Sequence, residues 1–532
     1  METFAADLAT MVRTPLTPDH VAAMRRVGTV IDVKAGAWFQ KAGERIDTFH
    51  YLLTGETEAV NAATGKRYGN ATLGPGQFFG ELAFLTGGRA FMGARAVQDT
   101  QLLCVRRDDM LKLMSDTPEM SDIIITVFAA RRRRMLDLSE GGLTLIGGEV
   151  DRDVRRIASF AARSRIPFVE VSLASTEGNA LAPHCSIRRA HPAVVFAKHQ
   201  VIDPPTPRGV AQTLGLDMAL RKEDVYDVAI VGGGPAGVAA GVYAGAEGLC
   251  AVVLEDLAIG GQAGNSSQIE NYMGFPAGIS GGDLVGRGEV QAMKFGTRFA
   301  VPVRAQHLEQ CEKHLFHIQL DTQDWVSAKA LIVATGVQYR RLPLDNLEAL
   351  EGSGVYYAAT DVEARYCKDT EVAIIGGGNS AGQAAMFLTR TAKHVHVLVR
   401  GEGLASSMSD YLLQRLESHP KITIHLCTEV KELHGDTTLT AITVRDRKGG
   451  QDWQINTKAL FVMVGAAPNT GWLSGLVELD ERGFVRTGRD VGGRDAYETS
   501  RPGIFAVGDV RAGSVKRVDS SVGDGSVVMS AV

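Results

Sequence analysis

The sequence has few cysteines, and none of them lies close to another. Six cysteines occur in 532 residues, and the nearest pair, Cys311 and Cys367, is 56 residues apart (367 − 311). Without a Cys-x-x-Cys motif, the sequence predicts neither a local redox dithiol nor a zinc site built on a cysteine pair, and we expect no metal. Sparse, unpaired cysteines are typical of a reducing compartment, so we expect a cytoplasmic protein.

An excess of positive charge and long apolar segments are also missing. The chain has 56 Lys+Arg against 61 Asp+Glu, a formal net charge of −5, which argues against a nucleic-acid partner. The N-terminus lacks the apolar core of a signal peptide. The uncharged stretch from Val228 to Ala246 contains Gly-Gly-Gly-Pro, which favours a strand, a turn and a helix over a membrane span. We therefore expect no membrane partner.

Glycine, in contrast, is abundant. The chain has 60 glycines, about 11 % of its residues against a usual ~7 %, with 17 prolines and no tripeptide period. This composition indicates many tight turns and places where the backbone approaches a ligand, rather than collagen or low complexity. At this length the chain exceeds a single hydrophobic core, so we expect several domains.

One pattern occurs twice along the chain. The segments that begin at Asp227 and Glu371 align without gaps at an offset of 144 residues (371 − 227), and each predicts a strand, a glycine-rich turn and a helix. Two such copies indicate two nucleotide-binding sheets.

The first copy has the glycine spacing of a dinucleotide site. Gly232, Gly234 and Gly237 follow an apolar strand and open an Ala-rich helix. The three glycines would form the turn, admit a pyrophosphate and let helix and strand pack closely, while the helix N-terminus offers N–H groups to the phosphates. Glu255 ends the next strand, where an acid would bind a ribose hydroxyl.

The second copy differs at that acidic position. Gly376 and Gly378 are present, and the third glycine position is taken by Ala381 or Gly382. The offset places Val399, followed by Arg400, where the first copy has Glu255. Loss of the acid and gain of a cation predict a 2′-phosphate and a preference for NADPH over NADH. The alternative is that Arg400 is an exposed loop charge.

Two later segments support this interpretation. Leu331–Gly336 predicts a strand that ends in a turn of small residues, and Asp509 follows the strand of Gly-Ile-Phe-Ala-Val. A carboxylate there could accept hydrogen bonds from a flavin ribitol chain, although Gly-Asp after a strand is also a common turn.

These segments resemble the low-molecular-weight thioredoxin reductase family, from about Asp224 to the C-terminus. The shared pieces are GGGPAG (232–237), GGQ (260–262), IENYMGFP (269–276), ATG (334–336), GGGNSAG (376–382) and VGDV (507–510). The resemblance implies a homodimer with FAD and NADPH as cofactors. It assigns FAD to Gly232, Gly234, Pro235, Ala236, Gly237, Glu255, Gly261, Gln262, Asn271, Ala334, Thr335, Gly336, Asp509, Arg517 and Val518 (the last in place of the family's Gln). It assigns NADPH to Gly376, Gly378, Asn379, Ser380, Ala381 and Arg400.

The chain departs from this family at the redox dithiol. The stretch that aligns with the family's Cys-x-x-Cys is YYAATD, with Ala358 and Asp361 in place of the cysteines, so we predict no catalytic residue of this kind. Cys367 is nearby, but a lone thiol cannot cycle as an internal disulfide, and its residue type favours a small buried side chain. Electrons would have to leave the flavin for an acceptor outside the chain.

The first ~138 residues resemble a cyclic-nucleotide-binding β-roll. The pieces that carry this resemblance are residues 35–59 and LGPGQFFGELAFLTGGRA (73–90). It assigns a ribose hydroxyl to Glu81 and a cyclic phosphate to Arg89, with spacing one residue short of the family's and Gly88 where proline is common. We expect a cyclic nucleotide or another small ligand. The run Arg131–Arg134 indicates either an acidic-partner patch or, preferably, cations near a helix C-terminus.

The segment from Leu143 to Leu216 resembles a thioredoxin or glutaredoxin fold without its cysteines. Its role would be structural or a docking surface, and Pro192 is a candidate for a cis bond.

Together these patterns predict a multidomain protein: a β-roll, a small thioredoxin-like α/β unit and a two-domain α/β flavoprotein. The predicted domains are 1–138 (β-roll and helix), 140–217 (thioredoxin-like), 224–341 and 461–532 (FAD-binding), and 342–460 (NADPH-binding). The leading hypothesis is an FAD-dependent NADPH oxidoreductase with an unidentified acceptor, controlled by the N-terminal domain. The alternative is a weakly catalytic FAD-bound sensor.

Overall fold

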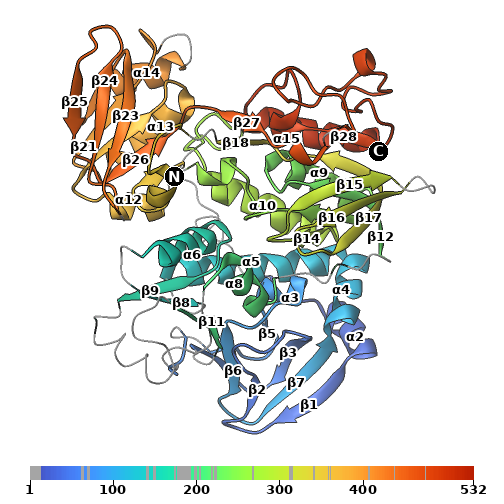
Figure 1. Ribbon diagram of the computed structural model, residues 1–532. Helices are drawn as coiled ribbons and strands as arrows, with labels where there is room; N and C mark the ends of the chain where they lie inside the picture. Colours follow the sequence, from blue (N-terminus) through green and yellow to red (C-terminus); the bar gives the residue numbers. More distant parts are fainter. Residues whose placement is uncertain are drawn as a thin grey trace.

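The computed structural model describes four units, of which the fourth is inserted into the sequence of the third (Figure 1). The described residues are 14–61, 65–68, 72–138, 143–147, 151–172, 175, 193–196, 200–202, 205–216, 220, 224–266, 269–310, 315–339, 342–357, 359, 361–404, 408–436, 438–473 and 475–532. Pro192, Ala358, Cys185 and Cys311 lie outside these residues.

The N-terminal unit is a roll of two small antiparallel sheets closed by helices. One sheet has the order β1-β7-β3-β5 and the other β2-β6-β4. The strands are β1 (Thr29–Val33), β2 (Trp38–Gln40), β3 (Thr48–Thr54), β4 (Thr57–Asn61), β5 (Phe78–Phe79), β6 (Met92–Ala96) and β7 (Thr100–Arg106), and the helices are α2 (Pro18–Val27), α3 (Ala83–Thr86), α4 (Arg107–Asp116) and α5 (Pro118–Leu138). Four buried phenylalanines, Phe49, Phe78, Phe84 and Phe128, join the roll to α5. The predicted β-roll with a following helix is therefore present.

The middle unit is a four-stranded sheet with helices, as the hydrophobic pattern predicts. Its elements are β8 (Leu143–Gly147), α6 (Arg152–Arg163), β9 (Phe168–Ser172), β10 (Ala193–Phe196), β11 (Gln200–Ile202) and α8 (Pro207–Leu214). The order is β11-β10-β8-β9, with β8 parallel to β9 and β10 antiparallel to both of its neighbours. Apolar residues of α6 and α8 cover the sheet.

The first α/β unit is built from two stretches of chain that are far apart in sequence. Its sheet has the order β14-β13-β12-β17-β16-β15, and β28 is added in parallel to β17. The strands are β12 (Val225–Val231), β13 (Ala251–Leu254), β14 (Arg298–Ala300), β15 (Ala305–Gln310), β16 (Phe316–Leu320), β17 (Trp325–Val333) and β28 (Ile504–Ala506). The helical elements are α9 (Pro235–Ala246), η1 (Ala263–Asn265), α10 (Gly281–Lys294), η2 (Gly471–Leu473), η3 (Arg489–Val491), η4 (Gly508–Val510), α15 (Val518–Val527) and η5 (Val528–Ser530). The continuous apolar runs of β12, β13 and β17 are buried on both faces, as parallel strands require.

The second α/β unit repeats the arrangement on a smaller scale. Five parallel strands have the order β19-β26-β20-β21-β22, and β23-β24-β25 form a separate antiparallel sheet. The elements are α11 (Leu347–Leu350), β19 (Val355–Tyr356), α12 (Asp361–Tyr366), β20 (Glu371–Ile375), α13 (Asn379–Leu388), β21 (His394–Leu398), α14 (Asp410–Glu417), β22 (Ile422–His425), β23 (Thr428–His434), β24 (Ala441–Asp446), β25 (Asp452–Ile455) and β26 (Ala459–Val462).

A ribbon of two short strands connects the two α/β units. β18 (Val337–Tyr339) pairs antiparallel with β27 (Ala466–Pro468). The predicted domain boundary between residues 460 and 461 falls inside β26, which belongs to the second sheet. The chain therefore leaves the second unit after Val462.

The arginine run of α5 makes specific contacts between elements. Arg131 donates to the carbonyls of Gly80 (2.7 Å) and Phe78 (2.8 Å). Arg133 donates to Asp283 of α10 (2.8 Å), and α5 continues to Leu138, beyond the run. The preferred sequence interpretation, cations near the helix C-terminus, was therefore wrong: these arginines fasten the roll and the first α/β unit to α5.

Within the described residues, no helix is long and apolar enough to cross a membrane. The segment Val228–Ala246 forms β12, the turn and α9, as predicted.

The contact between α15 and α9 leads to the first prediction. A Cβ atom at Gly525 would lie 2.1 Å from the carbonyl oxygen of Ala236 in α9, whereas one at Gly523 would meet nothing within 4 Å. Gly525→Ala should therefore destabilise the protein by about 1–3 kcal/mol through overpacking. Gly523→Ala, on the same helix, should stabilise it by about 0.5–1 kcal/mol. Urea unfolding of both variants measures the difference, and equal stabilities would contradict the packing described here.

Candidate functional site

The first glycine-rich turn leaves no room for side chains. Gly232 has φ = 114°, and a Cβ there would lie 2.2 Å from the carbonyl oxygen of Ala334. A Cβ on Gly237 would lie 1.8 Å from the carbonyl oxygen of Gly232. The first and third glycines are therefore needed so that α9 can pack against β12 and β17, as the motif predicts.

The start of α9 is open to a ligand. Gly234 is the N-cap and no side chain caps the helix; Pro235 and Ala236 are its first residues. The nearest atom to a Cβ on Gly234 would be the Cα of Gly261, 3.8 Å away. The uncapped N–H groups and the positive end of the helix dipole thus face the narrow space between two glycines, which suits a diphosphate.

Glu255 lies beside this turn, where a ribose would extend from the diphosphate. Its carboxylate accepts hydrogen bonds from the backbone N–H of Gly233 (2.7 Å) and of Leu257 (3.1 Å). The side chain is buried, and this burial, together with neighbouring Asp256, raises the pKa of Glu255 to about 7.

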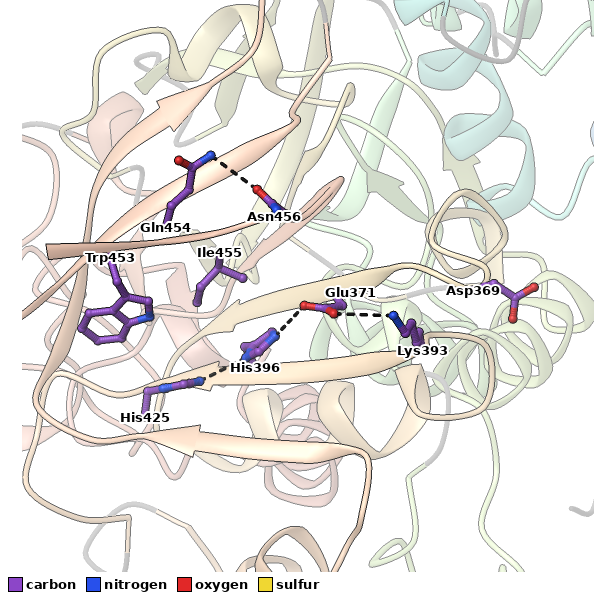
Figure 2. A pocket seen from close by; sticks show the side chains of 9 residues that line it. All are labelled: Asp369, Glu371, Lys393, His396, His425, Trp453, Gln454, Ile455 and Asn456. Carbon is purple, nitrogen blue, oxygen red and sulfur yellow. Dashed lines mark hydrogen bonds and ion pairs between the residues drawn. The ribbon is translucent and has the colours of Figure 1, made fainter.

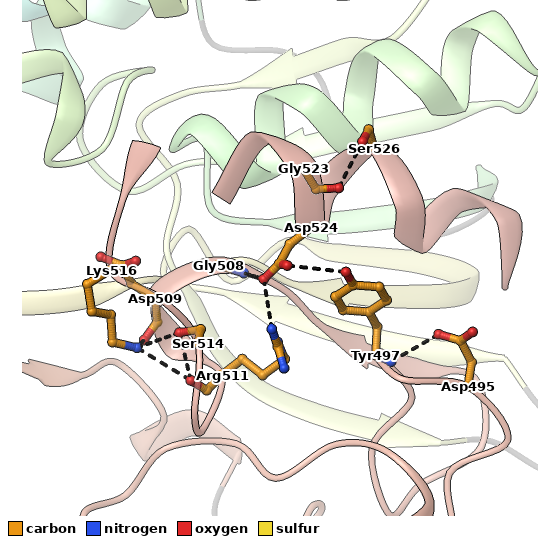
Figure 3. A network of polar contacts seen from close by, with 10 residues as sticks. All are labelled: Asp495, Tyr497, Gly508, Asp509, Arg511, Ser514, Lys516, Gly523, Asp524 and Ser526. Atoms are coloured by element: carbon orange, nitrogen blue, oxygen red, sulfur yellow. Dashed lines mark hydrogen bonds and ion pairs between the residues drawn. The ribbon is translucent and has the colours of Figure 1, made fainter. Parts of the chain in front are cut away.

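Asp509 lies in η4, directly after β28, and η4 lies close to the first turn of α9, because a Cβ on Gly508 would be 2.9 Å from the Cβ of Ala236. Asp524 of α15 holds this segment by accepting hydrogen bonds from the N–H of Gly508 (3.1 Å) and from the guanidinium of Arg511 (3.3 Å), as Figure 3 shows. The Oδ1 atom of Asp509 is buried and has no hydrogen-bond partner among the described residues, and burial raises the pKa of Asp509. A buried acceptor without a partner is the feature that a ligand hydroxyl would satisfy.

Asn265 is a candidate that the sequence analysis missed. Its Oδ1 atom is also buried without a hydrogen-bond partner among the described residues. Asn265 is the last residue of η1, the 3-10 turn that begins directly after the Gly-Gly-Gln segment. This position was the signal in the sequence that could have identified it.

The remaining FAD candidates are only partly brought together. Gln262 donates to the carbonyl of Val337, Thr335 donates to that of Asn469 (2.9 Å), and Gly336 has φ = 58°. Arg517 is the N-cap of α15 and Val518 its first residue. The side chains of Arg517 and Asn271 are exposed. Their assignment to FAD therefore stays a prediction.

The second glycine-rich turn has the same construction. Gly376 has φ = 148°, and its Cβ would lie 2.4 Å from the carbonyl oxygen of Met463; Gly378 is the N-cap of α13, again with no side-chain cap. Asn379, Ser380 and Ala381 open α13. A Cβ on Gly382 would lie 2.7 Å from Leu412 of α14, so Gly382 serves helix packing, and Ala381 holds the third position of the motif.

Arg400 lies two residues beyond Leu398, whose carbonyl at the end of β21 accepts the N–H of Gly376 in this turn (3.1 Å). It follows β21 and the buried Val399, and it is exposed. Its carbonyl accepts from Arg447 (3.3 Å). An exposed guanidinium beside an uncapped helix N-terminus can pair with a phosphate monoester.

A histidine pocket lies on the second unit at the start of β20, the strand whose other end leads into the glycine-rich turn. His396 contacts His425 (Nδ1 to Nε2, 3.1 Å) and Glu371 (Nε2 to Oε2, 3.2 Å), and Trp453 completes the wall (Figure 2). Burial lowers the pKa of His425. In the described part of the chain, no group of three His, Cys, Asp or Glu side chains could hold a metal ion.

The two candidate residues of the N-terminal roll have different partners. Glu81 forms an ion pair with Arg132 of α5, and Arg89 donates to the carbonyl of Gly43 (2.8 Å). Oε1 of Glu81 and Nε of Arg89 are buried with no hydrogen-bond partner among the described residues. An unused acceptor and an unused donor fit the ribose hydroxyl and the phosphate of a cyclic nucleotide.

The cysteines of the described residues are not placed for internal redox cycling. Cys367 is fully buried, and burial raises the pKa of its thiol to about 12. Cys250 is exposed, and Cys104 and Cys427 are partly buried; all four cysteines are free. Asp361 is the first residue of α12. Cys367 thus has the buried environment that the sequence favoured.

Comparison with known proteins identifies the origin of this architecture. Residues 226–525 match the family model for pyridine nucleotide-disulphide oxidoreductases. The chain belongs to this family. It is 33 % identical over 304 residues to thioredoxin reductase of Mycolicibacterium smegmatis, covering 57 % of this chain and 94 % of that protein. It is 32 % identical over 312 residues to NADPH-dependent thioredoxin reductase 3 of Arabidopsis thaliana, covering 57 % of this chain and 57 % of that protein.

Solved structures agree with this assignment. Lactococcus lactis thioredoxin reductase in its FR conformation superposes with a TM-score of 0.52 at 30 % identity, covering 57 % of this chain and 95 % of that chain. Residues 30–117 match the family model of the cyclic nucleotide-binding domain. The chain is therefore a thioredoxin reductase-like oxidoreductase that uses FAD and NADPH, preceded by a cyclic nucleotide-binding domain.

The environment of Glu255 leads to a prediction about FAD binding. The ionised carboxylate accepts hydrogen bonds from ribose hydroxyls better than the protonated acid, and its pKa of about 7 means that it ionises as the pH rises through neutrality. FAD should therefore bind the FAD-free protein more tightly at pH 8 than at pH 6. Glu255→Gln should weaken FAD binding by about 10-fold at pH 8 and remove this pH dependence. Fluorescence titration with FAD measures both effects, and an unchanged pH profile in Glu255→Gln would contradict the assignment.

The position of Arg400 leads to a prediction about coenzyme preference. Arg400→Gln should raise the KM for NADPH by about 10-fold and leave that for NADH within twofold, because only NADPH carries the 2′-phosphate. Lys448→Gln removes a nearby exposed cation that pairs with Glu402 (2.8 Å) and should change neither value. Steady-state kinetics with ferricyanide as acceptor tests this, and equal loss for the two coenzymes would argue for a merely structural role.

Proposed function

We propose that this chain passes electrons from NADPH through FAD to an acceptor that is not part of the chain, under the control of its N-terminal domain. When bound, NADPH supplies a hydride equivalent and FAD accepts it and passes the electrons on. The observation that carries the proposal is the combination of two intact glycine cradles with the absence of any Cys-x-x-Cys motif in 532 residues.

The residues of the chain have definite tasks in this scheme. The uncapped starts of α9 and α13 bind the diphosphates, Glu255 and Asp509 orient the FAD by accepting hydroxyl hydrogens, and Arg400 selects the phosphorylated coenzyme. Ala358 and Asp361 stand where the family's resemblance places the dithiol, so the electrons have no cysteine relay within the chain. Ferredoxin, a quinone, oxygen and an external disulfide are the acceptor classes compatible with this scheme. A homodimer is also expected from the resemblance.

A second candidate function is an FAD-bound sensor with little turnover. The sensor function is favoured by the contacts between α10 and α5, the helix that closes the N-terminal roll. These contacts attach the oxidoreductase part directly to the roll. Anaerobic mixing with NADPH separates the two: rapid loss of absorbance near 450 nm supports the oxidoreductase, and an unresponsive flavin supports the sensor.

The missing dithiol leads to a stoichiometric prediction. An enzyme whose electrons stop at the flavin should take up one NADPH per FAD for full reduction, because no disulfide accepts a second pair. Anaerobic titration should show this equivalence, and the number of thiols that react with a thiol reagent should be the same before and after reduction. A second equivalent accompanied by two new thiols would reveal a hidden disulfide and refute the scheme.

A further inference from the structure

The middle unit contacts Arg89, one of the two candidate ligand residues of the N-terminal roll. The backbone N–H of Arg89 donates to the carbonyl of Leu214, the last residue of α8, at 2.8 Å. Gly215, the C-cap of α8, has φ = 67°, and a Cβ there would lie 3.3 Å from the Cα of Gly88 and 3.6 Å from the Cγ of Arg89. The end of α8 therefore packs against the backbone and the side-chain stem of Arg89 with no space between them.

This contact places partial negative charge on Arg89. The last carbonyls of a helix have no partner within it and form the negative end of the helix dipole. In α8, the N–H of Gly215 bonds to the carbonyls of Ala211 and Gln212, which leaves the Leu214 carbonyl for Arg89. An oxygen from the protein thus takes the backbone donor of the residue that would bind an anion. Arg89 Nε and Glu81 Oε1 are each buried and have no hydrogen-bond partner in the described structure.

The same unit is attached to the first α/β unit. At the other end of α8, Arg208 forms an ion pair with Asp321, in the turn between β16 and β17 (2.6 Å). From α6, Arg163 donates to the carbonyl of Gly261 (3.3 Å), which faces the candidate diphosphate position of Gly234. A displacement of the middle unit would therefore change the contacts of the loop at Gly261, which lies at the candidate FAD site.

The middle unit also reaches the second α/β unit. Arg155 of α6 donates to the carbonyl of Gly352 (3.4 Å) and to the hydroxyl of Tyr356 (3.5 Å), and its guanidinium lies 4.7 Å from the ring centre of Tyr366. One small unit therefore contacts Arg89 of the roll and both α/β units. Figure 1 shows α6 and α8 between the roll and the α/β units.

We propose that the middle unit is an autoinhibitory strut, in which the end of α8 occupies the anion position at Arg89. An anionic ligand held by Glu81 and Arg89 displaces the end of α8. This displacement loosens the contacts of Arg155 and Arg163 with the nucleotide-binding units. Ligand binding and docking of the strut oppose each other, so whatever weakens docking must strengthen binding by the same factor. The consequence for electron transfer rests on the proposed function, whereas the competition at Arg89 does not.

Calorimetry on the full-length, FAD-loaded protein, with cyclic AMP and cyclic GMP as probes, tests the competition. Three variants weaken docking at three different contacts: Gly215→Ala, Arg208→Gln and Arg155→Gln. Gly215→Ala should bind a probe about fivefold more tightly than the unmodified chain, because an Ala at positive φ strains the docked end of α8. Arg208→Gln and Arg155→Gln should bind the probe about twofold to fivefold more tightly, because a partly exposed polar contact contributes only this much to docking.

Matched controls separate docking from general strain. Gly248→Ala has the same kind of positive φ (77°) with no atom within 4 Å of the added Cβ. Arg445→Gln removes a similar Arg–Asp pair (with Asp452, 2.6 Å) that joins β24 to β25 in the second α/β unit, and Arg156 is an exposed residue beside Arg155 on α6. Gly248→Ala, Arg445→Gln and Arg156→Gln should all keep the affinity of the unmodified chain.

The competition is overturned if neither nucleotide binds any form of the protein, or if the docking variants and their controls bind equally. Because this measurement needs no NADPH, it stands apart from whether the flavin turns over. The loosening of the contacts of Arg155 and Arg163 is tested separately by stopped-flow reduction of the flavin with NADPH. A saturating concentration of the cyclic nucleotide should change the rate of flavin reduction at least twofold in the unmodified chain and much less in Arg155→Gln. An identical response in both forms would overturn the loosening.

Discussion

The close approach of α9 to the first turn determines the rest of the oxidoreductase part. Because Gly237 carries no side chain, the start of α9 lies against the carbonyl of Gly232. Gly232 itself lies against the carbonyl of Ala334, directly after β17. This packing points the free N–H groups of the helix at the Gly261 loop. It also gives α15 a surface on which Gly525 rests. The nucleotide cradle and the hydrophobic core of this unit are therefore the same set of contacts, and neither can be changed without the other.

Repetition of this device explains how one chain can hold two similar coenzymes differently. The turns at Gly232 and Gly376 share strand, backbone conformation and uncapped helix, and differ at the end of the next strand, where one presents buried Glu255 and the other exposed Arg400. A buried carboxylate accepts hydroxyl hydrogens, whereas an exposed guanidinium receives a phosphate. In the proposed assignment, the chemical difference between the two sites therefore rests on Glu255 in one and Arg400 in the other.

The sequence predicted those parts of the structure that depend on local patterns. The strand–turn–helix segments, the positions of Glu255 and Asp509 after strands and the burial of Cys367 followed from spacing and residue type. Contacts between units could not be found in this way, because no periodicity links Arg133 to Asp283 or Leu214 to Arg89. Asn265 was missed since its role depends on the burial of one side-chain oxygen, and the boundary at 460 was misplaced because β26 pairs with a strand from much earlier in the chain.

The narrow β18–β27 ribbon has a consequence for how this protein is made. The second α/β unit is an insertion within the first, whose sheet and helical cover are completed only when β28 and α15 have been synthesised, after the whole inserted unit. Until then, the apolar edge of β17 and the face of α9 have no partner on the nascent chain, and such surfaces are prone to aggregation. The incomplete sheet therefore stays exposed for as long as the inserted unit takes to emerge, and this interval is the stage of synthesis at which aggregation competes most strongly with folding.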